Sequence, residues 1–452
     1  MHYKREEIAR KGKRMYSAYI TTLKEIHKHS NADRLNCATV FGNNVIVSLD
    51  YYVGQKVVYF PVDGQLSEEF ARDNNLVRVK DENGNNIGGY LDPEKRNIKA
   101  LKLRGEQSDG LVLPVEVLSK YTDVGNLKDG DQISEINGVE ICRKYIPARP
   151  KNRRNYSGDK KSKKRNPKAM YPQFVEHSDT AQLAFNQAAF REGDTCYITL
   201  KMHGTSARTA NTVEVKTKKR NKFLKLLGFK DKESKQYHVV SGTRRVVLTD
   251  FDTPGYHGSN QFREPYHRFF ADKLPKGVEV FYEIVGWVNS EQTIMGRCKN
   301  SMIKDKTFTK QYGEETIFSY GCGQGENECY VYRMTMTNQD GDVVEIPWEF
   351  VQILCERMGV KCVPTFDKFL FTTWEDLMAR VEKYYDGADP IGKTHIREGV
   401  VVRIDNRPTF TAYKHKNWFF KCLEGIVKDL SDQPDMEEAQ EFVEDGGDEF
   451  AG

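Results

Sequence analysis

The chain has 452 residues, of which 38% are hydrophobic and 30% are charged. This balance is typical of a soluble globular protein, and the length allows two or three domains. No apolar run approaches the roughly 18 residues of a membrane span. The first residues carry charge without the apolar core of a secretion signal, and the nine cysteines form no dense framework. Both features indicate a cytoplasmic protein with reduced thiols.

Charge is distributed unevenly, although the net charge is only +4. Residues 143–168 hold 12 Lys/Arg and one Asp, whereas residues 429–452 hold 10 Asp/Glu and no Lys/Arg. A second basic run spans residues 216–235. Basic blocks in a chain of modest net charge indicate local contact with a polyanion, and a solvated linker is the alternative.

The first third of the chain shows short β-runs separated by Gly- and Asn-containing turns. The runs expected to form strands are residues 45–49, 57–62, 99–103 and 110–114. Many short strands in so few residues predict a small β-barrel, and we expect one of the OB type.

The rest of the chain mixes the hydrophobic periodicity of helices with that of strands, which predicts an α+β fold. Helices are expected at residues 175–189, 265–274, 347–358 and 373–385, and strands at 195–201, 236–240, 278–287, 400–404 and 409–414. The expected organisation is a basic tail (1–15), the barrel (16–141), a basic linker (142–170), a mixed domain (171–428) and an acidic tail (429–452).

The strand predicted at 195–201 ends in Lys201, and a glycine turn at Gly204 follows it. Alternation places Lys201 on the same strand face as Tyr197 and Thr199. A lysine held beside backbone that can approach a ligand suits a nucleophilic amine, which needs burial or charged neighbours for activation. An ordinary charge at a strand end is the alternative that the spacing leaves open.

The segment Lys201-Met202-His203-Gly204 resembles the Lys-x-(Asp/His)-Gly motif of the covalent nucleotidyltransferases. These are the DNA ligases, the RNA ligases and the mRNA capping enzymes, whose lysine forms a phosphoramidate with a nucleoside monophosphate. Histidine at the third position resembles the RNA-ligase branch. The resemblance implies that Lys201 is the nucleophile and that His203 and Gly204 belong to the nucleotide site.

Three later segments resemble further motifs of this superfamily, in the same order. Around Thr243, the resemblance implies a phosphate-binding arginine, with Arg244 favoured over Arg245. In Phe281–Gly286 it implies that Glu283 binds the ribose hydroxyls or lies near a metal ion. In Cys329–Met334 it implies that Tyr332 stacks on adenine, and Tyr320 is the alternative.

Two motifs near residue 400 complete the set. The segment Arg397–Arg403 resembles the motif whose glutamate, here Glu398, holds a divalent ion near the phosphates. The segment Ala412–Lys416 resembles the motif whose two lysines, here Lys414 and Lys416, neutralise the triphosphate. ATP and Mg²⁺ or Mn²⁺ are the cofactors that the resemblance implies.

The N-terminal third is similar to the OB domain of the nick-sealing RNA ligases first described in Deinococcus and frequent in phages. The similarity lies in residues 32–35, 54–63 and 103–111. Only 36 residues follow Lys416, which we expect to be too few for the C-terminal OB domain of DNA ligases and capping enzymes. The residues expected to contact nucleic acid are Arg104, Arg153, Arg154, Lys163 and Lys164.

We therefore expect an ATP-dependent RNA ligase with an N-terminal OB-like domain and a nucleotidyltransferase domain of ATP-grasp-like, mixed-sheet fold. It is expected to join the 3′-hydroxyl and 5′-phosphate ends of a nicked RNA duplex or RNA/DNA hybrid. Its intermediate is expected to be lysyl-AMP, its form a monomer and its location the cytoplasm, with a phage or viral origin left open. The alternatives are a DNA ligase, a guanylyltransferase, or a non-catalytic nucleic-acid-binding protein.

Overall fold

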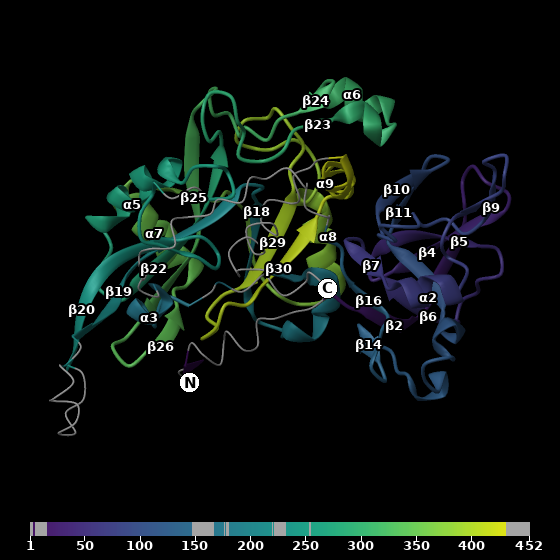
Figure 1. Ribbon diagram of the computed structural model, residues 1–452, viewed down its shortest axis with the longest axis horizontal. Coiled ribbons are helices and arrows are strands. Elements are labelled where there is room, and N and C mark those ends of the chain that lie inside the picture. Colours follow the sequence, from purple (N-terminus) through teal and green to yellow (C-terminus); the bar gives the residue numbers. More distant parts are fainter. Residues whose placement is uncertain are drawn as a thin grey trace.

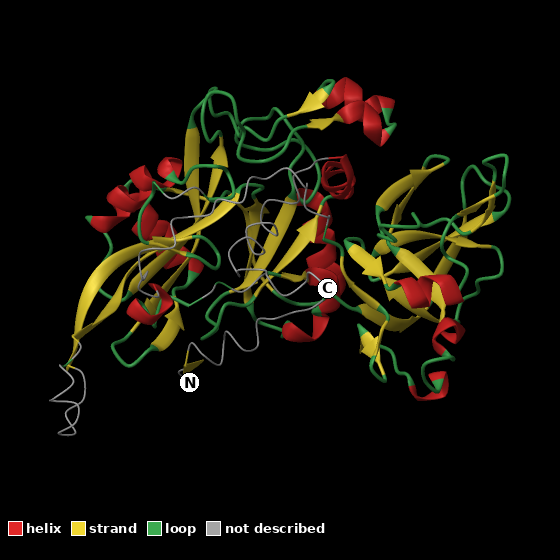
Figure 2. Ribbon diagram, viewed as in Figure 1, coloured by secondary structure: helices red, strands yellow, loops and turns green. Residues whose placement is uncertain are grey.

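The computed structural model describes residues 3–4, 16–146, 167–175, 177, 180–218, 220, 232–252 and 255–430. These residues form a smaller unit (16–146) and a larger unit (3–4 and from 167), which lie side by side (Figure 1). Strands dominate both units and helices lie around them (Figure 2), so the predicted α+β class is confirmed. Within these ranges, every helix is too short or too polar to cross a bilayer.

The smaller unit is built from short antiparallel sheets. A four-stranded sheet has the order β12-β6-β2-β13 (Leu111–Pro114, Lys56–Phe60, Ala18–Thr22, Gln132–Ile133), and a three-stranded sheet consists of β3 (Glu25–Lys28), β4 (Leu35–Val40) and β5 (Asn43–Ser48). Four two-stranded pairs complete it: β7 (Gly64–Leu66) with β16 (Cys142–Lys144), β8 (Val79–Lys80) with β9 (Asn86–Gly88), β10 (Ala100–Leu103) with β11 (Glu106–Asp109), and β14 (Glu135–Ile136) with β15 (Val139–Glu140). The strand pairing between residues 16 and 146 does not close into a barrel. The four strands predicted in this region are confirmed as β5, β6, β10 and β12.

The larger unit contains two main sheets. An eight-stranded sheet has the order β1-β26-β25-β22-β19-β20-β21, with β27 added beside β25. Its strands are β1 (Tyr3–Lys4), β26 (Asp342–Glu345), β25 (Asn327–Thr337), β22 (Val278–Gly286), β19 (Thr205–Lys218), β20 (Lys232–Gly242), β21 (Val247–Leu248) and β27 (Lys361–Cys362). A five-stranded sheet has the order β17-β30-β29-β18-β28 (Ala181–Gln182, Ala412–Lys416, Gly399–Ile404, Thr195–Lys201, Thr365–Leu370). A short pair, β23 (Cys298–Lys299) and β24 (Glu315–Thr316), lies outside both.

Helices cover these sheets and bury their apolar faces. α5 (Glu264–Ala271) packs on β19 and β20, α7 (Trp348–Met358) on β25 and α8 (Trp374–Tyr384) on β29. α9 (Trp418–Leu430) packs instead on β10 of the smaller unit and on β23, which lies outside both sheets. The shorter helices are α2 (Glu68–Asp73), α3 (Pro167–Met170) and α6 (Lys306–Tyr312). Local sequence sets the ends of α7 and α8. Thr373 caps α8 by accepting a hydrogen bond from the Asp376 amide, and Gly359 ends α7 with a φ of 73°.

The helix predicted over residues 175–189 is wrong. The described residues there form β17 and two short 3-10 turns, Leu183–Phe185 and Gln187–Ala189. β17 pairs in parallel with β30, joining Ala181 to Tyr413. This long-range pairing, together with burial of Leu183, outweighs the local helical pattern.

Contacts at more than one place join the units, and the first is aromatic. Phe185 of the larger unit stacks on Tyr19 of the smaller one, with ring centroids 4.0 Å apart, and lies edge-on to Phe41 at 5.1 Å. The second contact lies between α9 and the β10–β11 hairpin, which are neighbours in Figure 1, and it includes an ion pair between Lys421 and Asp109. These contacts set the smaller unit beside the helix that follows β30.

Candidate active site

Lys201 lies where the chain passes from one sheet of the larger unit to the other. Its strand, β18, is an inner strand bordered by β28 and β29, and β19 begins in the second sheet at Thr205. The turn between them needs Gly204, because a Cβ there would lie 2.4 Å from the Ile284 carbonyl oxygen and 2.9 Å from Cγ of Glu283. The glycine therefore lets the turn after Lys201 press directly on β22.

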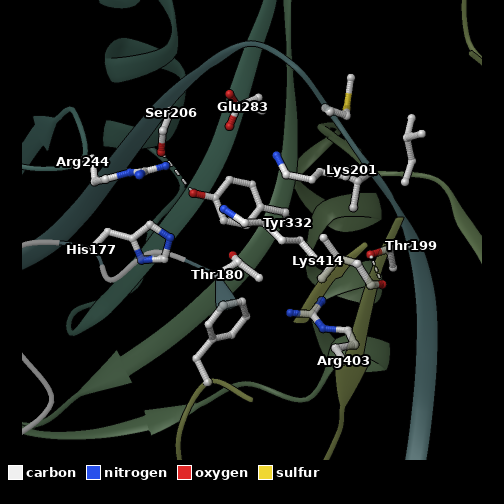
Figure 3. Close-up of a pocket in the computed structure, with 15 residues that line it drawn as sticks. His177, Thr180, Thr199, Lys201, Ser206, Arg244, Glu283, Tyr332, Arg403 and Lys414 are labelled. Carbon is white, nitrogen blue, oxygen red and sulfur yellow. Dashed lines mark hydrogen bonds between the residues drawn. The ribbon is translucent and has the colours of Figure 1, made fainter. Parts of the chain in front are cut away.

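A pocket with about 680 Å³ of empty space, open to solvent, lies beside this turn (Figure 3). Five of the residues predicted for nucleotide transfer line it: Lys201, Arg244, Glu283, Tyr332 and Lys414. They come from segments far apart in the sequence, and Figure 3 shows Lys201 and Arg244 on opposite sides of the pocket. The structure thus brings together a primary amine, two further cations, a buried carboxylate and an aromatic ring.

Glu398 binds the Lys201 amine. The carboxylate is buried, with a side chain 2% exposed, and its Oε1 lies 2.7 Å from Lys201 Nζ and 3.3 Å from Lys416 Nζ. Gly399 allows this approach, because a Cβ there would lie 2.8 Å from the Cα of Lys416 and closer still to the His415 carbonyl. Glu398 and Lys416 are therefore held against Lys201 rather than along the pocket wall.

His203 lies behind the nucleophile and not in the pocket lining. Its ring makes edge contacts with Phe318 and Phe420, each at 4.7 Å between centroids. Burial lowers the pKa of His203 to about 4. The imidazole is therefore neutral at pH 7 and adds no positive charge beside Lys201.

The two candidate tyrosines occupy different places. Tyr332 lines the pocket, and its hydroxyl lies 3.1 Å from Oγ of Ser206. Tyr320 is 2% exposed, and its hydroxyl accepts a hydrogen bond from the His203 amide at 2.7 Å. The geometry therefore favours Tyr332 as the ring available to a base, whereas Tyr320 fixes the turn after Lys201.

The other predicted residues lie outside the pocket. Arg245 is half-buried and is not among the lining residues. Arg104 forms the turn between β10 and β11, with a φ of 49°, and its carbonyl accepts a hydrogen bond from Asn31. Arg153, Arg154, Lys163 and Lys164 lie outside the described residues.

Several residues at the site were not predicted from the sequence. His177, Ser206, Arg403 and Phe410 line the pocket, and Glu424 of α9 binds Lys416. Burial lowers the pKa of Arg403 to about 10, and its guanidinium lies 4.3 Å from the centre of the Trp348 ring. Ser206 follows directly after Gly204 and Thr205, and this position beside the nucleophile was the signal that could have identified it.

A divalent cation fits the chemistry of this donor set. In the described part of the chain, no cluster of three or more His, Cys, Asp or Glu side chains forms a ready-made cage. Glu398 Oε2 is nevertheless buried and accepts no hydrogen bond from the described residues. One or two carboxylates combined with substrate phosphates and water is the usual protein environment of Mg²⁺. Glu398 is therefore the residue best suited to hold such an ion, with Glu283 across the turn.

The pocket lies where the chain passes from one sheet to the other, with a lysine at the end of a strand and several cations facing the same space. This is the arrangement expected of a covalent nucleotidyltransferase. A family model described as RNA ligase matches residues 194–421, half of the chain, from the start of β18 to α9. The chain belongs to the RNA ligase family. The search of curated proteins found no match.

The fold is similar to that of the RNA ligase of Naegleria gruberi in several solved structures. A mutant with ATP and Mn gives a TM-score of 0.52 at 18% identity, covering 90% of this chain and 97% of that chain. An apo mutant gives 0.54 at 18% identity, with 92% and 99% covered. A mutant with AMP and Mn gives 0.52 at 18% identity, with 89% and 97% covered. Coverage of this extent includes the smaller unit as well as the larger one.

Proposed function

We propose that this RNA ligase is ATP-dependent and joins 3′-hydroxyl to 5′-phosphate ends through a covalent lysyl-AMP intermediate. The observation that carries the proposal is the position of Lys201, at the end of β18, in the pocket wall and 2.7 Å from Glu398. The Naegleria RNA ligase structures with ATP and with AMP support adenosine as the nucleoside.

In the first step the Lys201 amine attacks the α-phosphorus of ATP. An N–P bond forms, the bond to the bridging oxygen of the β-phosphate breaks, and pyrophosphate leaves. The amine must be neutral to attack, so Lys201 first loses one proton to water and loses a second as the N–P bond forms. Glu398 fixes the direction of the amine through the 2.7 Å contact. Lys414 and Arg244 face the same pocket, where they can balance the charge that develops on the phosphates. A bound Mg²⁺ or Mn²⁺ would supply further charge neutralisation at the phosphates, with Glu398 and Glu283 as the residues to hold it.

Two group transfers follow. The 5′-phosphate of the RNA attacks the phosphorus of lysyl-AMP and takes the AMP, which releases Lys201. The 3′-hydroxyl then attacks the activated 5′-phosphate, and AMP leaves as the phosphodiester forms. Tyr332 and Glu283 are suited to hold the adenosine through stacking and ribose contacts.

The proposed substrate is a nicked RNA duplex or RNA/DNA hybrid, sealed by a monomer in the cytoplasm. We assign nucleic-acid holding to the smaller unit, as an OB-like domain of residues 16–141, and to the basic linker of 142–170. Residues 171–428 would carry nucleotide transfer. A strand ending in RNA at its 3′-hydroxyl is expected to be sealed faster than one ending in DNA, because the 2′-hydroxyl distinguishes the two. Equal rates on both nicks would contradict this substrate choice.

The deciding experiment incubates the protein with labelled ATP, GTP or NAD. We expect label from ATP alone, stable on a denaturing gel and located by peptide mass on Lys201. Lys201→Ala is expected to remove the label while circular dichroism stays unchanged, because this side chain lies at the pocket wall rather than in the core. Label from GTP would indicate a guanylyltransferase, and label that persists in folded Lys201→Ala would exclude this nucleophile. No label from any nucleotide would indicate a nucleic-acid-binding protein without turnover.

A further inference from the structure

Glu424 lies on α9, beyond the last segment that resembles a ligase motif. Both of its carboxylate oxygens lie 2.9 Å from Lys416 Nζ. The two side chains are 7% and 12% exposed, so the pair is largely shielded from water. A contact this close in such a setting contributes more than a surface ion pair, and breaking it leaves a buried ammonium group.

Lys416 and Lys201 compete for one carboxylate oxygen. Glu398 Oε1 lies 2.7 Å from Lys201 Nζ and 3.3 Å from Lys416 Nζ. The four groups form an alternating row in the order Lys201, Glu398, Lys416, Glu424. Without Glu424, Lys416 would lose its 2.9 Å contacts and would be drawn further onto Glu398, which also binds Lys201.

The start of α9 is fixed to the same carboxylate residue. The Asn417 amide donates to the backbone carbonyl of Glu398 at 2.8 Å, and the Asn417 side chain accepts a hydrogen bond from the Phe420 amide at 3.2 Å. Phe420 in turn contacts the His203 ring behind Lys201. Glu424 therefore extends from a helix that is already built into the nucleophile's surroundings.

We propose that Glu424 is a positioning residue for nucleotide transfer, which anchors Lys416 so that Glu398 stays available to Lys201. This inference rests on the proposed function, because it assigns Glu424 to the lysyl-AMP step. Glu424 acts on the nucleophile through Lys416 and Glu398 and is not itself among the residues that line the pocket.

The test compares Glu424→Gln, Glu424→Asp, Lys416→Met and the double variant Glu424→Gln/Lys416→Met in the full chain. Glu349→Gln is the matched control, since Glu349 pairs with Lys368 on the surface with a side chain 63% exposed. Urea denaturation of the four combinations of Glu or Gln at 424 and Lys or Met at 416 measures whether the two residues interact. Quench-flow labelling with ATP measures kcat and KM for lysyl-AMP formation.

We expect Glu424→Gln to lower kcat for labelling at least tenfold, with KM for ATP changed less than threefold. An effect of this size is typical of residues that orient a group in direct contact with the reacting atoms. Glu424→Asp should recover part of the rate, and Glu349→Gln should match wild type. In urea, the double variant should lose less stability than the two single variants together.

Additive stability losses would show that Glu424 and Lys416 do not interact, and would overturn the proposal. So would a Glu424→Gln enzyme that labels within twofold of the wild-type kcat. If wild type itself takes no label from ATP, the proposed function fails instead, and the urea comparison still decides whether the pair exists.

Discussion

Single residues set the charge balance around the nucleophile. Lys201 and Lys416 are matched by Glu398 and Glu424, and His203 adds no charge at neutral pH. Before nucleotide binds, these four charged groups therefore sum to zero. Arg244, Arg403 and Lys414 also line the pocket, and we expect these cations to meet an incoming triphosphate first.

Tyr332 should contribute to ATP binding through its aromatic ring rather than through its hydroxyl. Tyr332→Ala is expected to raise KM for ATP about tenfold or more, since stacking of a base on an aromatic side chain is worth about 1–3 kcal/mol. Tyr332→Phe keeps the ring and removes the hydroxyl with its 3.1 Å interaction with Ser206, so it should stay within about threefold of wild type. Initial rates of lysyl-AMP formation over a range of ATP concentrations measure both. Equal losses in the two variants would assign the effect to the hydroxyl.

His415 should make stability depend on pH. Burial, with the nearby Lys421 as the second cause, lowers the pKa of His415 to about 3. Below pH 6.5 His415 binds a proton in the unfolded chain but not in the folded chain. Its contribution to the free energy of unfolding is therefore fully present above pH 6.5 and is lost as the pH drops toward 3. The loss is up to about 1.4 kcal/mol per pH unit. Urea denaturation from pH 7 to pH 4 should show a shallower fall for His415→Gln. Parallel curves for the two proteins would contradict this assignment.

At the scale of elements, the sequence predicted local structure well and long-range contacts poorly. β18 was predicted with its observed bounds, because its alternation and its terminal lysine lie within seven consecutive residues. The segment 175–189 failed because its conformation depends on pairing with β30, more than 200 residues later. Glu424 was missed for the same reason, since only the folded chain places α9 against Lys416.

The segment that failed as a helix provides the aromatic contact between the units. Phe185→Ala should lower the free energy of unfolding by about 2 kcal/mol, because it removes a partly buried ring stacked on Tyr19. We also expect calorimetry to show the two units unfolding at more widely separated temperatures. Phe350→Ala is the control, since that ring is 60% exposed. One transition shifted uniformly would mean that Phe185 stabilises the fold without coupling the units.

At the scale of the whole molecule, nucleic-acid holding and nucleotide transfer should be separable. A variant in which four basic residues of the linker become serine should bind RNA with a weaker salt dependence. The replaced residues are Arg153, Arg154, Lys163 and Lys164. The log–log slope should shrink by about 0.7 to 0.9 for each phosphate interaction that the substitutions remove, because each such interaction releases counterions.

The same variant should take label from ATP at the wild-type rate, because every pocket residue lies after Lys168. The matched control replaces four exposed lysines of the larger unit: Lys299, Lys304, Lys306 and Lys310. Binding titrations between 50 and 200 mM salt provide the measurement. An unchanged slope in the linker variant would return residues 142–170 to the role of a solvated tether.

The ion pairs between the units restrict how such a chain can recombine during evolution. Asp109 and Lys421 are both largely buried, and Lys102 meets Asp305 at 2.5 Å across the same boundary. An exchange of the N-terminal third for one from another ligase would leave Lys421 and Asp305 without these partners, at the cost of burying unpaired charge. A successful chimera therefore has to keep both partners of each ion pair or exchange their charges together, as in Asp109→Lys with Lys421→Asp. Among descendants of this chain, positions 109 and 421 should consequently change as a pair, although they lie in different units.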